Sequence, residues 1–224
     1  MMINSFKLNL ALLLLALLCG YVSLINAQTY SNCQMFGSHK VEWTLDETNN
    51  RLSARFSINN SGGWGAVGMK NPSDGSGMTG ATIVLGYGSG NGTINEYYAN
   101  GNSQPSRLSS NQFTSATSTT SGSTTTMTYV RSLTRPQNAP STYYALSKGT
   151  KTTLLFAAHS SQQPSSPTNF VAHDAYSIFA SGIDFFSTST CGTPKKSNDG
   201  QSSVRNGVMS MMIVALVVFM SFMF

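Results

Sequence analysis

The stretch KVEWTLDETNNRLSARFSI, residues 40–58, holds two runs of alternating apolar and polar residues around a polar turn. Successive side chains of a β-strand point to opposite faces, so each run predicts a strand with one buried face. The ETNN segment between them is typical of a tight turn, and the two strands are expected to pair as a hairpin. The apolar positions are Val41, Trp43 and Leu45 before the turn, and Leu52, Ala54, Phe56 and Ile58 after it.

Short segments of the same kind continue to residue 186, and no segment shows a convincing amphipathic helix. Many short strands in one domain predict an all-β fold, specifically an immunoglobulin-like antiparallel β-sandwich. The Ser/Thr-rich run 114–128 resembles a low-complexity linker. Threonine favours strands, however, so we predict a hairpin there with Thr120-Ser121-Gly122 as its turn. The other predicted strands are residues 64–69, 81–87, 93–99, 124–133, 141–147, 152–160 and 175–186.

The N-terminal segment, residues 1–27, has the composition of a secretory signal peptide. It contains Lys7, an apolar run from 8 to 18, and a small-residue ending at Ala27. This pattern predicts cleavage after Ala27. An uncleaved anchor is the alternative, but the apolar run is too short to span a bilayer.

The C-terminal segment, residues 208–224, is apolar and uncharged, and follows a polar spacer at 194–207. As a helix it would fall slightly short of the roughly 30 Å hydrocarbon core. Small residues, a spacer and an apolar tail together predict a glycosylphosphatidylinositol (GPI) signal whose tail is removed. Asn198 is the expected attachment residue, with Ser197 and Asp199 as alternatives. The protein is therefore expected on the extracellular face of the plasma membrane, held by a lipid anchor. A single C-terminal transmembrane helix is the alternative.

The remaining residues, 28–193, form one predicted domain. Only two of the three cysteines lie in it, Cys33 and Cys191, at its two ends. Export favours a disulfide between them. Sequons at Asn59 and Asn91 predict N-glycosylation in the same compartment.

Composition argues against two broad classes of function. The net charge is +5, but the basic residues are scattered along the chain, so nucleic-acid binding is not expected. Three histidines and eight acids occur without an HExxH, nucleophile-elbow or Walker motif, so hydrolase or kinase activity is not expected. The spacing of the histidines does not favour a zinc cluster. The glycine-rich GSGNG, residues 88–92, predicts a hairpin turn.

The order of segments carries more information than any one of them. VEWTLD is followed by GGWGAVGM and MTGATIVLGY, and later by LLFAAHSS and PTNFVAHDAYSIFASGIDFF. Over residues 36–188 this succession resembles the DOMON domain. That family includes the cytochrome domain of cellobiose dehydrogenase and membrane-anchored plant b-type cytochromes.

The resemblance implies a site for haem b. Haem-binding DOMON members hold the iron with a methionine from a Met-x-Gly turn, which corresponds to Met78 here. They also use a histidine before the last strand, which corresponds to His173. His159 is the alternative, because it follows an apolar strand. Met69 is interpreted as ordinary packing. Many relatives carry an acid after the turn, where this chain has Ala81.

The resemblance thus implies a cell-surface b-type cytochrome domain that transfers single electrons between separate donor and acceptor molecules. It favours a non-catalytic electron carrier over an enzyme. The alternative is a haem-free module that binds carbohydrate or a surface partner, since some family members lack the ligands. Its candidate stacking residues are Tyr97, Tyr98, Tyr143 and Tyr144.

Overall fold

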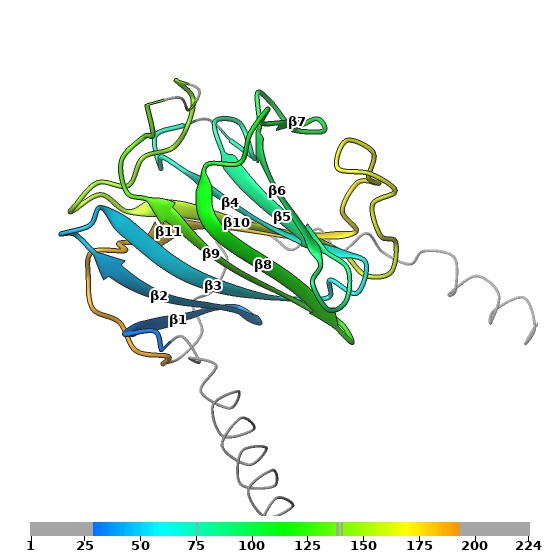
Figure 1. Cartoon of the computed structure of the whole chain (residues 1–224), viewed down its shortest axis with the longest axis horizontal. Helices are drawn as coiled ribbons and strands as arrows, with labels where there is room; N and C mark the ends of the chain where they lie inside the picture. Colours follow the sequence, from blue (N-terminus) through cyan, green and yellow to red (C-terminus); the bar gives the residue numbers. More distant parts are fainter. Residues whose placement is uncertain (1–28, 75, 138, 140, 193–224) are drawn as a thin grey trace, which may run out of the picture.

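A computed structural model describes residues 29–74, 76–137, 139 and 141–192, and all regular secondary structure in these residues is β-strand (Figure 1). The predicted all-β sandwich is confirmed. The strands are β1 (Asn32–Phe36), β2 (His39–Asp46), β3 (Arg51–Asn59), β4 (Trp64–Lys70), β5 (Thr82–Tyr87), β6 (Thr93–Tyr98), β7 (Ser106–Arg107), β8 (Phe113–Ser121), β9 (Thr124–Ser132), β10 (Thr152–His159) and β11 (Ala175–Ile183).

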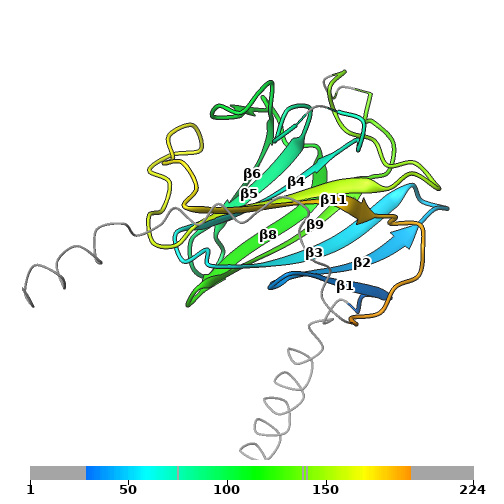
Figure 2. The same cartoon turned by 180° about the vertical axis from the view of Figure 1, so that it is seen from behind.

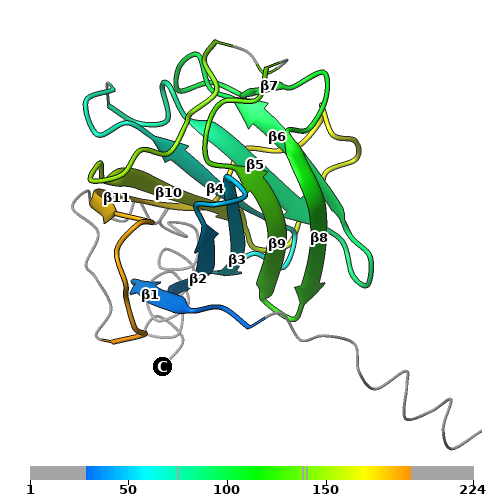
Figure 3. The same cartoon turned by 60° about the vertical axis from the view of Figure 1, so that its left-hand side comes forward.

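The strands form two antiparallel sheets that pack face to face (Figures 1 and 3). One sheet has the order β1-β2-β3-β9-β8 and the other β11-β10-β4-β5-β6-β7. Side chains from both inner faces build the main core between them. Its members include Val41, Trp43, Leu52, Ala54, Phe56 and Ile58 from the first sheet, and Val67, Met69, Val84, Leu154, Phe156 and Phe179 from the second.

The opening hairpin is β2–β3, and its predicted alternation is confirmed. Trp43 pairs with Ala54 and is fully buried, and its Nε1 donates a hydrogen bond to the Phe185 carbonyl at 2.9 Å. In the turn, the Asn49 amide donates to Asp46 Oδ1 at 3.0 Å. Asn50 takes a positive φ of 55°, a conformation that asparagine tolerates well.

Two other predicted hairpins are present. β8 and β9 pair as predicted, so the Ser/Thr-rich run is strand and not linker. The turn, however, lies at Gly122 and Ser123, because the predicted turn residues Thr120 and Ser121 belong to β8. Gly88 and Gly90 have positive φ in the connection between β5 and β6.

The predicted strand at residues 141–147 is wrong. Its backbone forms no strand ladder: the Tyr144 amide donates to Thr82 Oγ1 at 2.9 Å, Arg131 Nη2 donates to the Tyr144 carbonyl, and the Leu146 amide donates to the Leu133 carbonyl at 2.8 Å. The Arg131 guanidinium also lies over the Tyr143 ring, 4.5 Å from its centre. Aromatic composition gave the segment a strand-like pattern, but in the structure Tyr143 is buried beside Arg131 and Tyr144 packs against the main core.

The disulfide between Cys33 and Cys191 is confirmed, with Cα atoms 4.7 Å apart. Beside it, the Cys33 amide donates to the Ser189 carbonyl at 3.0 Å, so the bridge joins β1 to the segment that follows β11. The disulfide thereby links the first strand of the domain to its C-terminal segment.

Removal of this bridge is expected to destabilise the domain. The cysteines are 158 residues apart, and in the chain-entropy model a loop of that length contributes up to about 5 kcal/mol. The double variant Cys33→Ser/Cys191→Ser should therefore unfold at a clearly lower denaturant concentration than the wild type. Equal midpoints for the two proteins would show that the bridge contributes nothing.

Several sequence predictions fall on residues that the structure does not describe. These are the signal peptide, the polar spacer with Asn198, and the apolar tail. Among the described residues, no helix is long and apolar enough to cross a membrane. Of the two sequons, Asn91 is exposed in the β5–β6 connection, whereas Asn59 Nδ2 donates to the Ser38 carbonyl at 2.7 Å. Glycosylation at both stays a prediction.

Candidate functional site

The outer face of the six-stranded sheet is apolar. The outer face of such a sheet is commonly polar and solvated, but here β4 is buried along its whole length. The outward side chains of this sheet form a second apolar cluster, separate from the core between the sheets. The cluster contains Trp64, Ala66, Ile83, Leu85, Tyr97 and Leu155.

Part of this face is covered by the β10–β11 connection, residues 160–174 (Figures 1 and 2). Phe170 of this connection packs edge-on against Trp64 and Tyr97, with ring centres 5.7 Å apart in both pairs. The Tyr97 hydroxyl donates to the Pro167 carbonyl at 2.7 Å. These contacts fix the loop over one end of the apolar face.

The other end of the face is a cavity of about 530 Å³. Small residues on the sheet, Ala66, Gly68 and Ala157, leave room for it, and its volume falls within the range of roughly 300–1,000 Å³ typical of small-molecule sites. Met78 from the β4–β5 connection and His173 from the β10–β11 connection both line it. The structure therefore brings together the two residues that the sequence singled out.

Backbone hydrogen bonds hold the turn that carries Met78. The Gly80 amide donates to the Ala99 carbonyl at 2.9 Å, and the Ala81 amide donates to the Met78 carbonyl at 3.0 Å. Gly77 and Gly80 have φ of 65° and 81°, where L side chains are strained, so the glycines are required by the turn. Met78 is half-buried and packs against the outer apolar cluster.

His173 lies at the rim of the cavity and is largely exposed. Its ring centre is 5.0 Å from that of Tyr176. Partial burial lowers the pKa of His173, although a backbone hydrogen bond and the Asp174 carboxylate act in the opposite direction. The neutral imidazole, the form that binds metals, is therefore favoured.

Asp174 fastens the base of the loop that carries His173. Its carboxylate accepts hydrogen bonds from the Ser160 amide, at 3.0 Å from Oδ2, and from the Ser160 hydroxyl at 2.5 Å. Although partial burial acts to raise the pKa of Asp174, these bonds bring it below its usual value. Hydrogen bonds between Ser160 and the Asp174 carboxylate thus join the two ends of the 160–174 segment.

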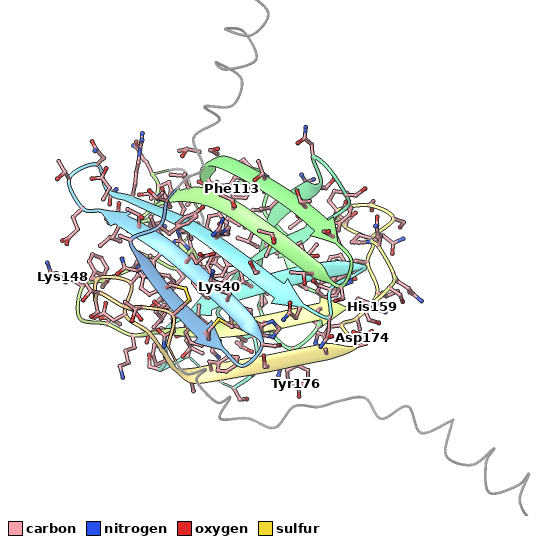
Figure 4. All side chains as sticks on the ribbon, turned by 90° about the horizontal axis from the view of Figure 1, so that it is seen from below. Lys40, Phe113, Lys148, His159, Asp174 and Tyr176 are labelled. Atoms are coloured by element: carbon pink, nitrogen blue, oxygen red, sulfur yellow. A yellow bond between two sulfur atoms is a disulfide. The ribbon has the colours of Figure 1, made fainter. Side chains whose placement is uncertain are left out.

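The other two histidines lie outside the cavity. His159 Nδ1 accepts from the Gln162 amide at 3.0 Å and is 3.7 Å from Asp174 Oδ2, at the end of β10 (Figure 4). His39 stacks on Phe156 with ring centres 4.6 Å apart, and burial lowers its pKa to about 4. The geometry thus favours His173 over His159 as the imidazole of this site.

Comparison with known proteins identifies the family of the chain. The family model of the DOMON domain matches residues 36–159, more than half of the chain. The chain belongs to the DOMON family. Met78 lies inside the matched region, and His173 lies beyond its end.

Two solved structures are similar in fold to this DOMON domain. The cytochrome b domain of pyranose dehydrogenase from Coprinopsis cinerea is 17% identical with a TM-score of 0.47, over 65% of this chain and 76% of that chain. The cytochrome domain of Myriococcum thermophilum cellobiose dehydrogenase is 11% identical with a TM-score of 0.45, over 63% of this chain and 73% of that chain. No curated protein matches the chain.

Two of the four tyrosines considered for a sugar-stacking platform are buried in this DOMON domain. Tyr97 and Tyr143 are 0% and 5% exposed, and Tyr98 and Tyr144 are half-buried. The exposed large apolar side chains of the described residues are Val171 and Tyr176, on either side of His173.

Among the side chains that line the cavity, the imidazole of His173 and the thioether of Met78 are the ones suited to bind iron. Within the described parts of the chain, no group of three His, Cys, Asp or Glu side chains could hold a metal ion. Asn102, which also lines the cavity, gave no signal in the sequence, because it lies in an ordinary polar loop and its partner is a backbone amide.

Proposed function

We propose that this DOMON domain binds haem b in the cavity, where Met78 and His173 would hold the iron, and that it carries single electrons. The observation that carries the proposal is that these two side chains, from separate loops, line one apolar-walled cavity. A thioether and an imidazole are a known axial pair for cytochrome haem. Ala66, Gly68 and Ala157 keep the sheet side of the cavity free of bulky side chains. The residues present therefore fit the group.

Bound haem would supply reversible one-electron chemistry at its iron. The contribution of Met78 would be to raise the potential, because a thioether ligand favours the reduced iron. His173 would provide the second ligand from its neutral imidazole. Because two side chains would hold the iron, the site would favour electron transfer over oxygen chemistry.

We also propose that the domain works outside the cell, attached to the membrane by a lipid anchor. The Cys33–Cys191 disulfide supports an oxidising compartment. The apolar tail supports the anchor. Electrons would then pass between a separate donor and a separate acceptor.

A redox titration of the purified haem-loaded protein tests the electron-transfer proposal. We expect a reversible one-electron curve and a reduced spectrum that carbon monoxide barely changes. Rapid carbon monoxide binding by the wild type would reveal an open axial position and would argue for oxygen or ligand chemistry instead.

A further inference from the structure

Beneath the Met78 turn lies a buried lysine. Lys70 is the last residue of β4, and strand alternation places it on the same face as Ala66 and Gly68, which line the cavity. Its side chain is 4% exposed. Lys70 Nζ donates to the Gly77 carbonyl at 2.9 Å and to the Asp74 carbonyl at 3.3 Å.

Burial of an ammonium group is costly unless it is well compensated. Burial lowers the pKa of Lys70, while the Asp74 carboxylate acts to raise it. Two hydrogen bonds of the ammonium group thus go to backbone carbonyls of the 71–81 connection. Lys70 therefore stabilises the backbone of the 71–81 connection.

The same peptide unit is held from its other side. The Met78 amide donates to Asn102 Oδ1 at 3.0 Å. The peptide bond between Gly77 and Met78 thus has its carbonyl bound by Lys70 and its N–H bound by Asn102. Gly77, with φ of 65°, has no Cβ to restrict rotation of this unit, so the two side chains supply the restraint.

We propose that Lys70 is a positioning residue for Met78. Together with Asn102 it fixes the plane of the Gly77–Met78 peptide and so directs the Met78 side chain into the cavity. The inference rests on the proposed function only for the ligand of Met78. The two hydrogen bonds to the Gly77–Met78 peptide, called the peptide restraint below, are present in the protein without haem.

Lys70→Met tests the proposal, because it keeps an apolar stem and removes the donor. In the haem-loaded protein we expect the haem content to be retained and the reduced haem to become reactive to carbon monoxide, with a lower potential. In the haem-free protein we expect peroxide to oxidise Met78 several-fold faster than in the wild type, as measured by mass spectrometry. The fully buried Met127 is the internal reference for oxidation.

Two further variants complete the design. Asn102→Ala, at an exposed position, should reproduce both effects and serves if Lys70→Met does not fold. Lys148→Met is the matched control, since that lysine is exposed and pairs with Glu47 at 3.3 Å; it should change neither readout.

The outcomes separate this inference from the proposed function. If the wild type binds no haem, the proposed function is contradicted. The rate of Met78 oxidation by peroxide then still tests the peptide restraint. If the wild type binds haem, and the Lys70 and Asn102 variants keep its spectrum and its Met78 oxidation rate, then these residues do not position Met78. The proposed function would still stand.

Discussion

His173→Ala is expected to lose most of the bound haem. The substitution removes the imidazole of the cavity, and neither of the other histidines lines it. Removal of a mere outer-shell partner of a metal ligand costs about 10- to 100-fold in affinity, so loss of the ligand itself should cost more than about 100-fold. Titration of the haem-free protein with haemin, followed by absorbance, measures the effect.

Two controls make the His173 result specific. His159→Ala should bind haem as the wild type does, because that ring lies at the end of β10 and contacts the backbone of the following turn. Free imidazole should restore part of the haem spectrum to His173→Ala by replacing the missing ligand. Full haem affinity in His173→Ala, with loss in His159→Ala, would contradict the assignment.

Met78→Ala is expected to retain haem but to open one axial position. Without the thioether the reduced iron should bind carbon monoxide, and the potential should fall, since the ligand that favours reduced iron is gone. The absorption spectrum with and without carbon monoxide, and a redox titration, measure both changes.

Met78→Leu separates ligation from packing. Leucine fills a similar volume, so the free energy of unfolding should fall by less than about 1.5 kcal/mol. The spectrum should nevertheless change as it does in Met78→Ala. Met69→Leu is the matched control in the main core, where the spectrum should stay that of the wild type. An unchanged spectrum in Met78→Leu would show that Met78 is no ligand.

Local pattern predicted most of the fold. The alternation at residues 40–58 defines the β2–β3 hairpin because one face of each strand is buried against the second sheet. The same logic failed at 141–147, where Arg131 and Thr82 from distant strands bond the backbone of the segment. Two short edge strands, β1 and β7, lack an alternating signal in the sequence and pair with β2 and β6.

The candidate site was predicted in part. Met78 stood out because a methionine in a glycine-rich turn has little core to fill, and the family resemblance pointed to His173. The supports of these residues could not be predicted, since they depend on contacts between loops. Lys70 and Asn102 read in the sequence as ordinary polar residues, yet both bond the turn of Met78. The hydrogen bond between Ser160 and Asp174, which joins the ends of the loop that carries His173, was likewise not predicted.

The absorption spectrum of the wild-type protein, expressed with ample haem and purified, tests the central claim most directly. Bound haem with two side-chain ligands predicts a Soret band and, after reduction with dithionite, sharp and split visible bands typical of low-spin b-type haem. Absence of a Soret band, with no change on addition of haemin to the folded protein, would contradict the cytochrome proposal and leave a haem-free binding module in its place.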